Sequence, residues 1–347
     1  MKKIKQNLIG VIGDLHFKDS LGFADHFEDR REGEKKEILT FITDMFEDCD
    51  SIVFLGDNLN ARNNTSKVIK EFVTFVESFN GKEVYILAGN HEKTGNGKSA
   101  IDFLKEIKNP KWHIITNEIT TIDDMVFCPY LTKPELETND NLEALKNLMK
   151  KLPDGKILFH HYAVTKGKTV EGLGISLEHM SEPVLGEGHL MKKYKLVLGG
   201  HVHVPYGGDN IVGVGSVFNN EVNEIGKFIW KIDMDKLTTE QIRLPGRSIF
   251  KIEDPTDETL EKISKKSILK VIITNKLPIL ELKELKKKLE KFDAYTITEK
   301  VVNTKRKMEY KEGESILEMG LEDLLKIYAK ERKIKPDILR RAYEIIK

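Results

Sequence analysis

A chain of 347 residues is long enough for one large or two medium domains with a buried core. Hydrophobic residues make up 39% and charged residues 32%, a composition that excludes an intrinsically disordered protein. The formal net charge is +0, so only a local charge asymmetry could favour binding to nucleic acid or to a membrane surface. Two cysteines are too few for a disulfide framework or a cysteine-rich zinc site.

The first residues are basic and are followed by a short apolar run that ends at Asp14. That run is too short for a signal peptide or a membrane span. We therefore expect a cytoplasmic protein that does not associate with membranes.

Up to about residue 235, short apolar runs alternate with amphipathic helical patterns. The runs are three to five residues long, as expected of strands buried on both faces. They are Leu8–Ile12, Ser51–Leu55, Val84–Ala88, Ile157–Phe159 and Leu196–Leu198. Helical patterns span about 38–46, 68–79 and 142–149, and paired glycines suggest further strands in 207–218. The alternation predicts a layered α/β architecture.

The pattern changes near Pro245. A helix that opens at Thr256, a second helix over about 282–292 and strands at Ile268–Thr274 and Tyr295–Val302 predict a small α/β unit. The segment after Ser315 predicts a terminal helix pair, because it starts with a capping box and later has Pro336 at the first turn of a helix. The expected domains are 1–244, 245–312 and 313–347.

A carboxylate, carboxamide or imidazole follows each of the five apolar runs. The segments are Gly13-Asp14-Leu15-His16, Gly56-Asp57-Asn58, Gly89-Asn90-His91-Glu92, His160-His161 and Gly199-Gly200-His201-Val202-His203. In open α/β sheets ligands bind outside the carboxyl ends of the strands, so we expect these side chains to converge. Each motif alone is weak evidence, but five in this order predict a metal centre.

Imidazole, carboxylate and amide ligands together suit manganese, iron or zinc, whereas oxygen ligands alone would suit magnesium. Two such ions about 3.5–4 Å apart can bind phosphoryl oxygens and activate water for phosphate-ester hydrolysis. The predicted chemistry is therefore two-metal hydrolysis of phosphate esters.

This series of motifs resembles the calcineurin-like metallophosphoesterase superfamily over about residues 8–232. The resemblance implies two facing β-sheets flanked by helices, two divalent metal ions, and a role for His91 as the acid that stabilises the transition state or protonates the leaving oxygen. It implies that one metal is bound by Asp14, His16, Asp57 and His203, and the other by Asp57, Asn90, His160 and His201. Relatives carry the ligand directly at the strand end, which favours His160 over His161.

The C-terminal third is similar in architecture to the SbcD nucleases, which include the eukaryotic Mre-eleven nuclease, and the length is most like that of the phage members. This likeness implies a capping domain that binds DNA, a helix-loop-helix that binds an SbcC-type ATPase, a homodimer, and manganese as the metal. A phage-encoded chain would work in the host cytoplasm. Many of these nucleases have a histidine where this chain has Asn60, so the balance of exonuclease and endonuclease activity stays open.

Charge supports this comparison. Residues 260–310 contain 14 Lys and Arg against 7 Asp and Glu, including Lys286-Lys287-Lys288 and Lys305-Arg306-Lys307. Such a surplus provides sequence-independent contacts to DNA phosphates. A solvated lysine-rich helix face would account for Lys286–Lys288 alone.

Three functions remain open. The first is a DNA-end nuclease that works with an ATPase in repair or recombination. The second is a stand-alone phosphoesterase that acts on small phosphodiesters or phosphoproteins. The third is a non-catalytic module, against which the complete set of ligand residues argues.

Overall fold

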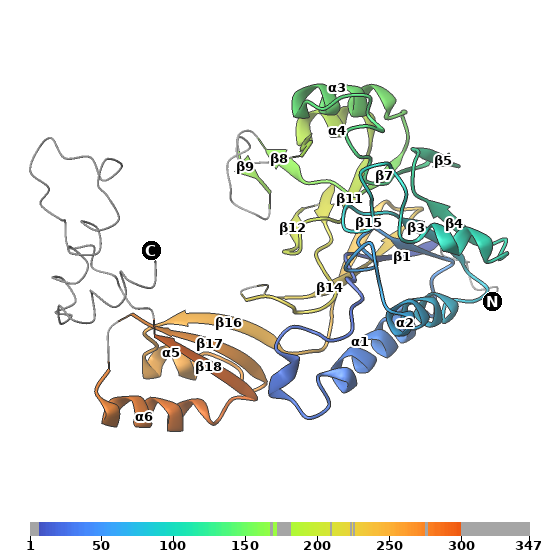
Figure 1. The fold of residues 1–347 in the computed structure, drawn as a ribbon. Coiled ribbons are helices and arrows are strands. Elements are labelled where there is room, and N and C mark those ends of the chain that lie inside the picture. The colour runs from blue at the N-terminus through green and yellow to red at the C-terminus, as the bar shows by residue number, and fades with distance from the viewer. Residues whose placement is uncertain are drawn as a thin grey trace, which may run out of the picture. The chain divides into compact units, whose positions relative to one another are not determined.

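The structure is a computed structural model that describes residues 7–166, 169–171, 182–208, 210–222, 224, 226–274 and 277–299 (Figure 1). The predicted terminal helix pair and the end of the last predicted strand lie outside these residues. Within the described ranges the strands form two six-stranded and two three-stranded sheets. No helix in these ranges is long and apolar enough to cross a membrane.

The first six-stranded sheet has the order β15-β14-β1-β2-β3-β4. Its strands are β1 (Leu8–Ile12), β2 (Ser51–Phe54), β3 (Glu83–Leu87), β4 (Trp112–Ile115), β14 (Phe228–Asp233) and β15 (Thr238–Arg243). Strands β1 to β4 are parallel, and β14 pairs antiparallel with β1. Helices α1 (Glu32–Met45) and α2 (Ser66–Glu77) pack on it, with a short turn η1 (Ala24–His26) before α1 and η2 (Asp102–Glu106) before β4.

The second six-stranded sheet has the order β12-β13-β11-β7-β6-β5. Its strands are β5 (Thr120–Ile122), β6 (Met125–Cys128), β7 (Ile157–His160), β11 (Leu196–Gly199), β12 (Tyr206–Gly207) and β13 (Ile211–Gly213). Helices α3 (Asn141–Lys151) and α4 (Glu187–Lys193) pack against it. A small sheet of β8 (Val164–Lys166), β9 (Thr169–Val170) and β10 (Leu185–Gly186) lies in the connection between β7 and α4.

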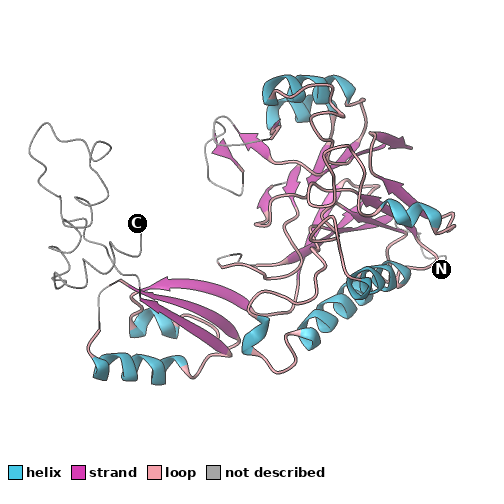
Figure 2. Ribbon diagram, viewed as in Figure 1, coloured by secondary structure: helices cyan, strands magenta, loops and turns pink. Residues whose placement is uncertain are grey.

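The two large sheets face each other. Alternate residues of β1, β2 and β3 share one buried cluster with alternate residues of β6, β7 and β11, for example Val11 and Val53 with Phe127 and Phe159. The intervening residues of each strand point away from the opposite sheet. In the first sheet they pack against α1 and α2, and in the second against α3 and α4. Figure 2 shows these helix pairs on opposite sides of the strands. The structure thus confirms the predicted sandwich of two sheets flanked by helices.

After β15, a separate parallel sheet of β16 (Ser248–Glu253), β17 (Ser267–Ile273) and β18 (Ala294–Glu299) begins. Helices α5 (Asp257–Glu261) and α6 (Ile279–Leu289) pack on one face of it around Leu269, Leu285 and Leu289. The predicted small α/β unit is therefore present. The side chain of Thr256 caps α5 by accepting the backbone N–H of Thr259, as the sequence predicted.

A buried ion-pair network joins α1 to the start of this unit. The guanidinium of Arg31 is fully buried and donates to both carboxylate oxygens of Glu34, at 2.8 and 2.7 Å. Arg247 donates to Glu34 at 2.7 Å and to Asp293 at 2.6 Å, and it lies over the ring of Phe27. The carboxylate of Glu34 is therefore the counter-charge for two arginines, of which Arg31 has no access to water.

Replacing Glu34 with Gln should lower the free energy of unfolding by about 3–5 kcal/mol, because the guanidinium of Arg31 would stay buried without its counter-charge. The matched control is Asp25→Asn, which removes the exposed ion pair between Asp25 and Arg30 and should cost less than about 1 kcal/mol. Denaturant unfolding curves measure both changes. Equal effects of the two variants would contradict the importance assigned to this network.

Candidate metal centre

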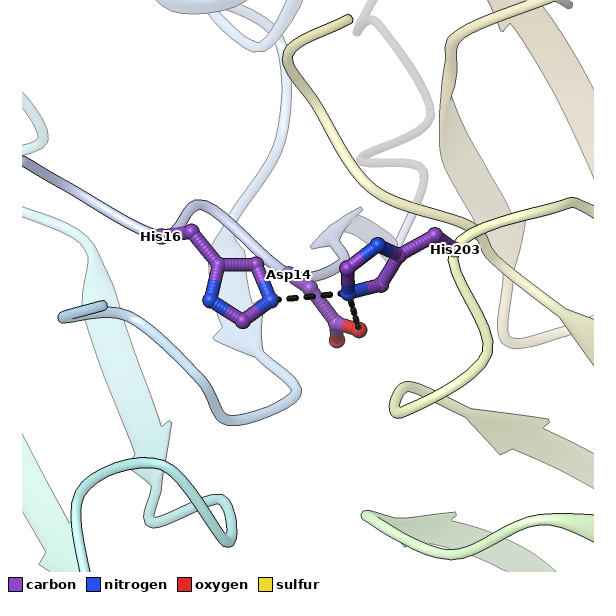
Figure 3. A group of neighbouring side chains, drawn as sticks. All are labelled: Asp14, His16 and His203. Carbon is purple, nitrogen blue, oxygen red and sulfur yellow. Dashed lines mark hydrogen bonds and ion pairs between the residues drawn. The ribbon is translucent and has the colours of Figure 1, made fainter. Parts of the chain in front are cut away.

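Asp14, His16 and His203 meet where the loop after β1 approaches the loop after β11 (Figure 3). Nε2 of His16 lies 2.9 Å from Nε2 of His203, and the latter atom lies 3.8 Å from Oδ2 of Asp14. The candidate ligand atoms of the three residues all lie within 4.8 Å of one another. Segments almost 190 residues apart in the sequence thus present three donor atoms to one point.

Asp57, in the loop after β2, lies between this cluster and a second group of candidate ligands. Its Oδ2 is 3.7 Å from Nε2 of His16 and 3.3 Å from Nε2 of His161. On the far side, Oδ1 of Asn90 is 3.1 Å from Nε2 of His161 and 3.0 Å from Nδ1 of His201. The central position of Asp57 is that of a carboxylate that can contact both of two neighbouring ions.

His161, rather than His160, is the histidine that reaches these side chains. Strand β7 includes His160, whose ring lies against Gly199 of β11 and whose Nδ1 accepts the backbone N–H of Tyr162 at 3.2 Å. Since side chains alternate along a strand, Phe159 points between the sheets, His160 points outwards, and His161 turns back towards the inter-sheet side. This geometry favours His161 as the candidate ligand, whereas the sequence favoured His160.

The backbone carbonyl of Leu55 fixes how His161 presents its ring. Nδ1 of His161 lies 2.7 Å from this oxygen and donates to it, so Nε2 is the nitrogen directed at Asp57 and Asn90. Burial alone would lower the pKa of His161, but the charges of Asp57 and Asp14 outweigh burial and raise this pKa to about 10. The raised pKa reflects how close Nε2 of His161 lies to the carboxylate of Asp57, at 3.3 Å.

His91 is exposed at the rim of the centre. Its ring stands edge-on to His16, with 4.8 Å between the ring centroids, and its backbone N–H donates to Oδ1 of Asp57 at 2.9 Å. Nδ1 of His91 lies 3.1 Å from the carbonyl oxygen of Asn60 and donates to it, which leaves Nε2 available. Asn60 thus contacts His91 through its backbone carbonyl.

Two motif residues whose side chains do not face the centre, Glu92 and Asn58, connect the loops around it by hydrogen bonds. The carboxylate of Glu92 is fully buried and accepts the backbone N–H groups of Gly89 at 2.8 Å and Leu59 at 2.9 Å. The side chain of Asn58 donates to the carbonyl of Leu87 at 2.9 Å. These bonds hold the loop after β2 against the loop after β3, so that Asp57 and Asn90 keep a fixed separation.

Three of the candidate ligands have left-handed backbone conformations: His16 at φ 46°, Asp57 at φ 47° and His201 at φ 79°. Such conformations are costly for residues other than glycine and are retained where a site requires them. The adjacent glycines supply space. A Cβ at Gly89 would lie 2.1 Å from Oδ1 of Asp57, and one at Gly200 would lie 2.6 Å from Oδ1 of Asp14.

Two carboxylates that sequence analysis did not identify also contact the centre. Oε1 of Glu182 is 2.6 Å from Nε2 of His201, and Oε1 of Glu224 is 2.8 Å from Nδ1 of His203. Neither glutamate belongs to a motif or lies near its histidine in the sequence, so no sequence signal could have identified them.

The donor set fits two divalent metal ions. Oδ2 of Asp14 is buried and accepts no hydrogen bond from the described residues, which is costly for a carboxylate oxygen unless a cation binds it. Burial lowers the pKa of His16 to about 4, despite the nearby charges of Asp57 and Asp14, so this imidazole is neutral and able to bind a metal. Imidazole, carboxylate and amide donors together are typical of manganese, iron or zinc sites.

Comparison with known proteins supports this interpretation. The family model for calcineurin-like phosphoesterases matches residues 8–205, more than half of the chain. A search of curated proteins found no match. Among solved structures, one reported as a novel archaeal phosphodiesterase is 16% identical, covers 68% of this chain and 99% of its own, and has a TM-score of 0.34, too low to indicate a shared substrate.

The matched region contains both histidines of the Gly-His-Val-His segment and all the other candidate ligands. Members of this family are phosphoesterases that use divalent metal ions. The chain belongs to the calcineurin-like phosphoesterase family.

Proposed function

We propose that this chain is a two-metal DNA nuclease subunit, with exonuclease and endonuclease activity at DNA ends, that uses Mn²⁺. The observation that most directly supports the two-metal part of this proposal is the convergence of seven side chains from both sheets on one centre. One ion would be bound by Asp14, His16, Asp57 and His203, and the other by Asp57, Asn90, His161 and His201. Bound there, the ions would neutralise phosphoryl oxygens and lower the pKa of the attacking water.

His91 would supply the proton. Its Nδ1 is engaged with the carbonyl of Asn60, so its Nε2 is the nitrogen free to protonate the leaving oxygen. Its ligand atom lies within 4.8 Å of those of His16 and Asp57, and its exposed position at the rim suits a group that meets the substrate beside the metal ligands. Asp57 receives the N–H of His91, which ties the position of this acid to the residue shared between the two ions.

The small unit after β15 supports DNA as the substrate. Lys286 and Lys287 are exposed on α6 and form no ion pair within the described part of the chain, whereas Lys288 pairs with Asp257 at 2.7 Å. An exposed lysine pair next to a phosphoesterase suits binding to a phosphate backbone. The division into domains at residues 244 and 312, an SbcC-type ATPase bound by residues 313–347, a homodimer and a cytoplasmic location belong to the same proposal.

The assay that tests the substrate compares linear duplex DNA, closed circular DNA and a chromogenic phosphodiester, each with Mn²⁺ and with chelator. We expect cleavage of linear DNA that stops in chelator. Changing Lys286 and Lys287 to Gln should weaken DNA binding for all sequences and reduce the slope of log affinity against log salt by about 0.9 per lost phosphate contact.

The control changes Lys146 and Lys150 on α3 to Gln, which alters net charge equally and should leave the salt dependence unchanged. Hydrolysis of the small diester should be the same in all three proteins. Diester hydrolysis without DNA cleavage would favour the stand-alone phosphoesterase and contradict the nuclease.

A second experiment tests the roles of the histidines. We expect His161→Asn to lower the amount of bound Mn²⁺ and His160→Asn to leave it unchanged, because Nε2 of His161 alone faces the centre, while an Asn at position 160 can still accept the N–H of Tyr162. His91→Ala should keep its metal and lose about 10²–10⁴-fold in turnover. Elemental analysis measures the bound Mn²⁺, and diester assays measure the turnover. Metal loss in His160→Asn but not in His161→Asn would contradict the assignment.

A further inference from the structure

The two histidines of the Gly-His-Val-His segment face the centre through different ring nitrogens. His201 presents Nδ1 to Asn90 at 3.0 Å, while His203 presents Nε2 to His16 at 2.9 Å. In each ring the other nitrogen lies against a carboxylate, Glu182 for His201 and Glu224 for His203. The tautomer and the orientation of each imidazole are therefore set by a separate glutamate.

Glu224 is itself held in place. It is 7% exposed, and its Oε2 accepts a hydrogen bond from Nζ of Lys227 at 3.0 Å. The Lys227 ammonium, also buried, donates to the hydroxyl of Ser216 and lies 3.4 Å from the carbonyl oxygen of His203. A buried acceptor held in place by Lys227 thus faces Nδ1 of His203.

Glu182 has different surroundings. Its side chain is 17% exposed, and none of the lysines or arginines in the described ranges forms an ion pair with it. The two glutamates therefore come from different segments and contact different histidines, and among the described residues they share no ion-pair partner.

We propose that Glu224 and Glu182 are positioning residues that set the affinity of the two metal sites separately. Glu224 acts through His203 on the site of Asp14 and His16, and Glu182 acts through His201 on the site of Asn90 and His161. A carboxylate that accepts the second N–H of a metal-binding histidine fixes the ring and increases its basicity, and its loss lowers metal affinity by about 10–100-fold. The inference rests on the proposed two-metal centre.

Calorimetric titration of the full chain with Mn²⁺ tests it. Wild-type protein should bind two ions. Glu224→Gln should weaken one of them and Glu182→Gln the other, each by about 10–100-fold. Since Glu224→Gln leaves the Lys227 ammonium buried without its counter-charge, a Glu224→Gln and Lys227→Met double variant is titrated too and should show the same single weakened site. Glu143→Gln, on the surface of α3, should change neither affinity.

A double-mutant cycle separates positioning from general destabilisation. In a His203→Asn protein, which retains only the other site, Glu224→Gln should have no further effect, whereas Glu182→Gln should keep its full effect on the remaining ion. The inference would be overturned if, in the His203→Asn protein, Glu224→Gln weakened binding of the remaining ion as much as Glu182→Gln does. It would also be overturned if Glu224→Gln weakened Mn²⁺ binding less than twofold in the wild-type background. Wild-type protein that binds no Mn²⁺ would instead overturn the proposed two-metal function, and the inference with it.

Discussion

Asp14 and Asp57 are buried carboxylates, and burying such groups is costly unless positive or polar partners surround them. The strands that carry these aspartates belong to the first sheet, but most of the imidazoles that face them, His161, His201 and His203, come from the second. The two sheets must therefore face each other with the carboxyl ends of β1, β2, β7 and β11 at one edge. The apolar cluster between the sheets maintains this arrangement of the strand ends. The packing of the core therefore also determines whether the metal centre can form.

The backbone accommodates this constraint at a local cost. His16, Asp57 and His201 adopt positive φ angles that only a strongly determined loop retains. Buried hydrogen bonds to Glu92 and Asn58 hold these loops together, while glycine at position 89 leaves room for Asp57. These conformations lower the stability of the folded chain relative to relaxed loops, but they keep the donor atoms of the centre close together.

The sequence was sufficient for the five strands that precede the polar motifs, because these strands follow from local patterns, but it predicted none of β4, β5, β6, β14, β15 and β16. Short buried runs predict strands, and polar residues directly after them predict convergence at the carboxyl edge. The sequence was insufficient to assign a ligand where the assignment depends on which face of a strand points inwards. The two histidines after β7 differ by one position, and only the packing of Phe159 between the sheets shows that His161 faces the centre. The roles of Glu182 and Glu224, like the pairing of Lys288 with Asp257, depend on tertiary contacts that no motif encodes.

Anomalous diffraction from crystals of the chain soaked in Mn²⁺ tests the two-metal centre most directly. Data collected on both sides of the manganese absorption edge would locate the ions without reference to activity. The structure predicts two peaks, one beside His16 and His203 and the other beside Asn90, His161 and His201, with Asp57 in contact with both. A single peak, or a peak beside His160 in place of His161, would contradict it.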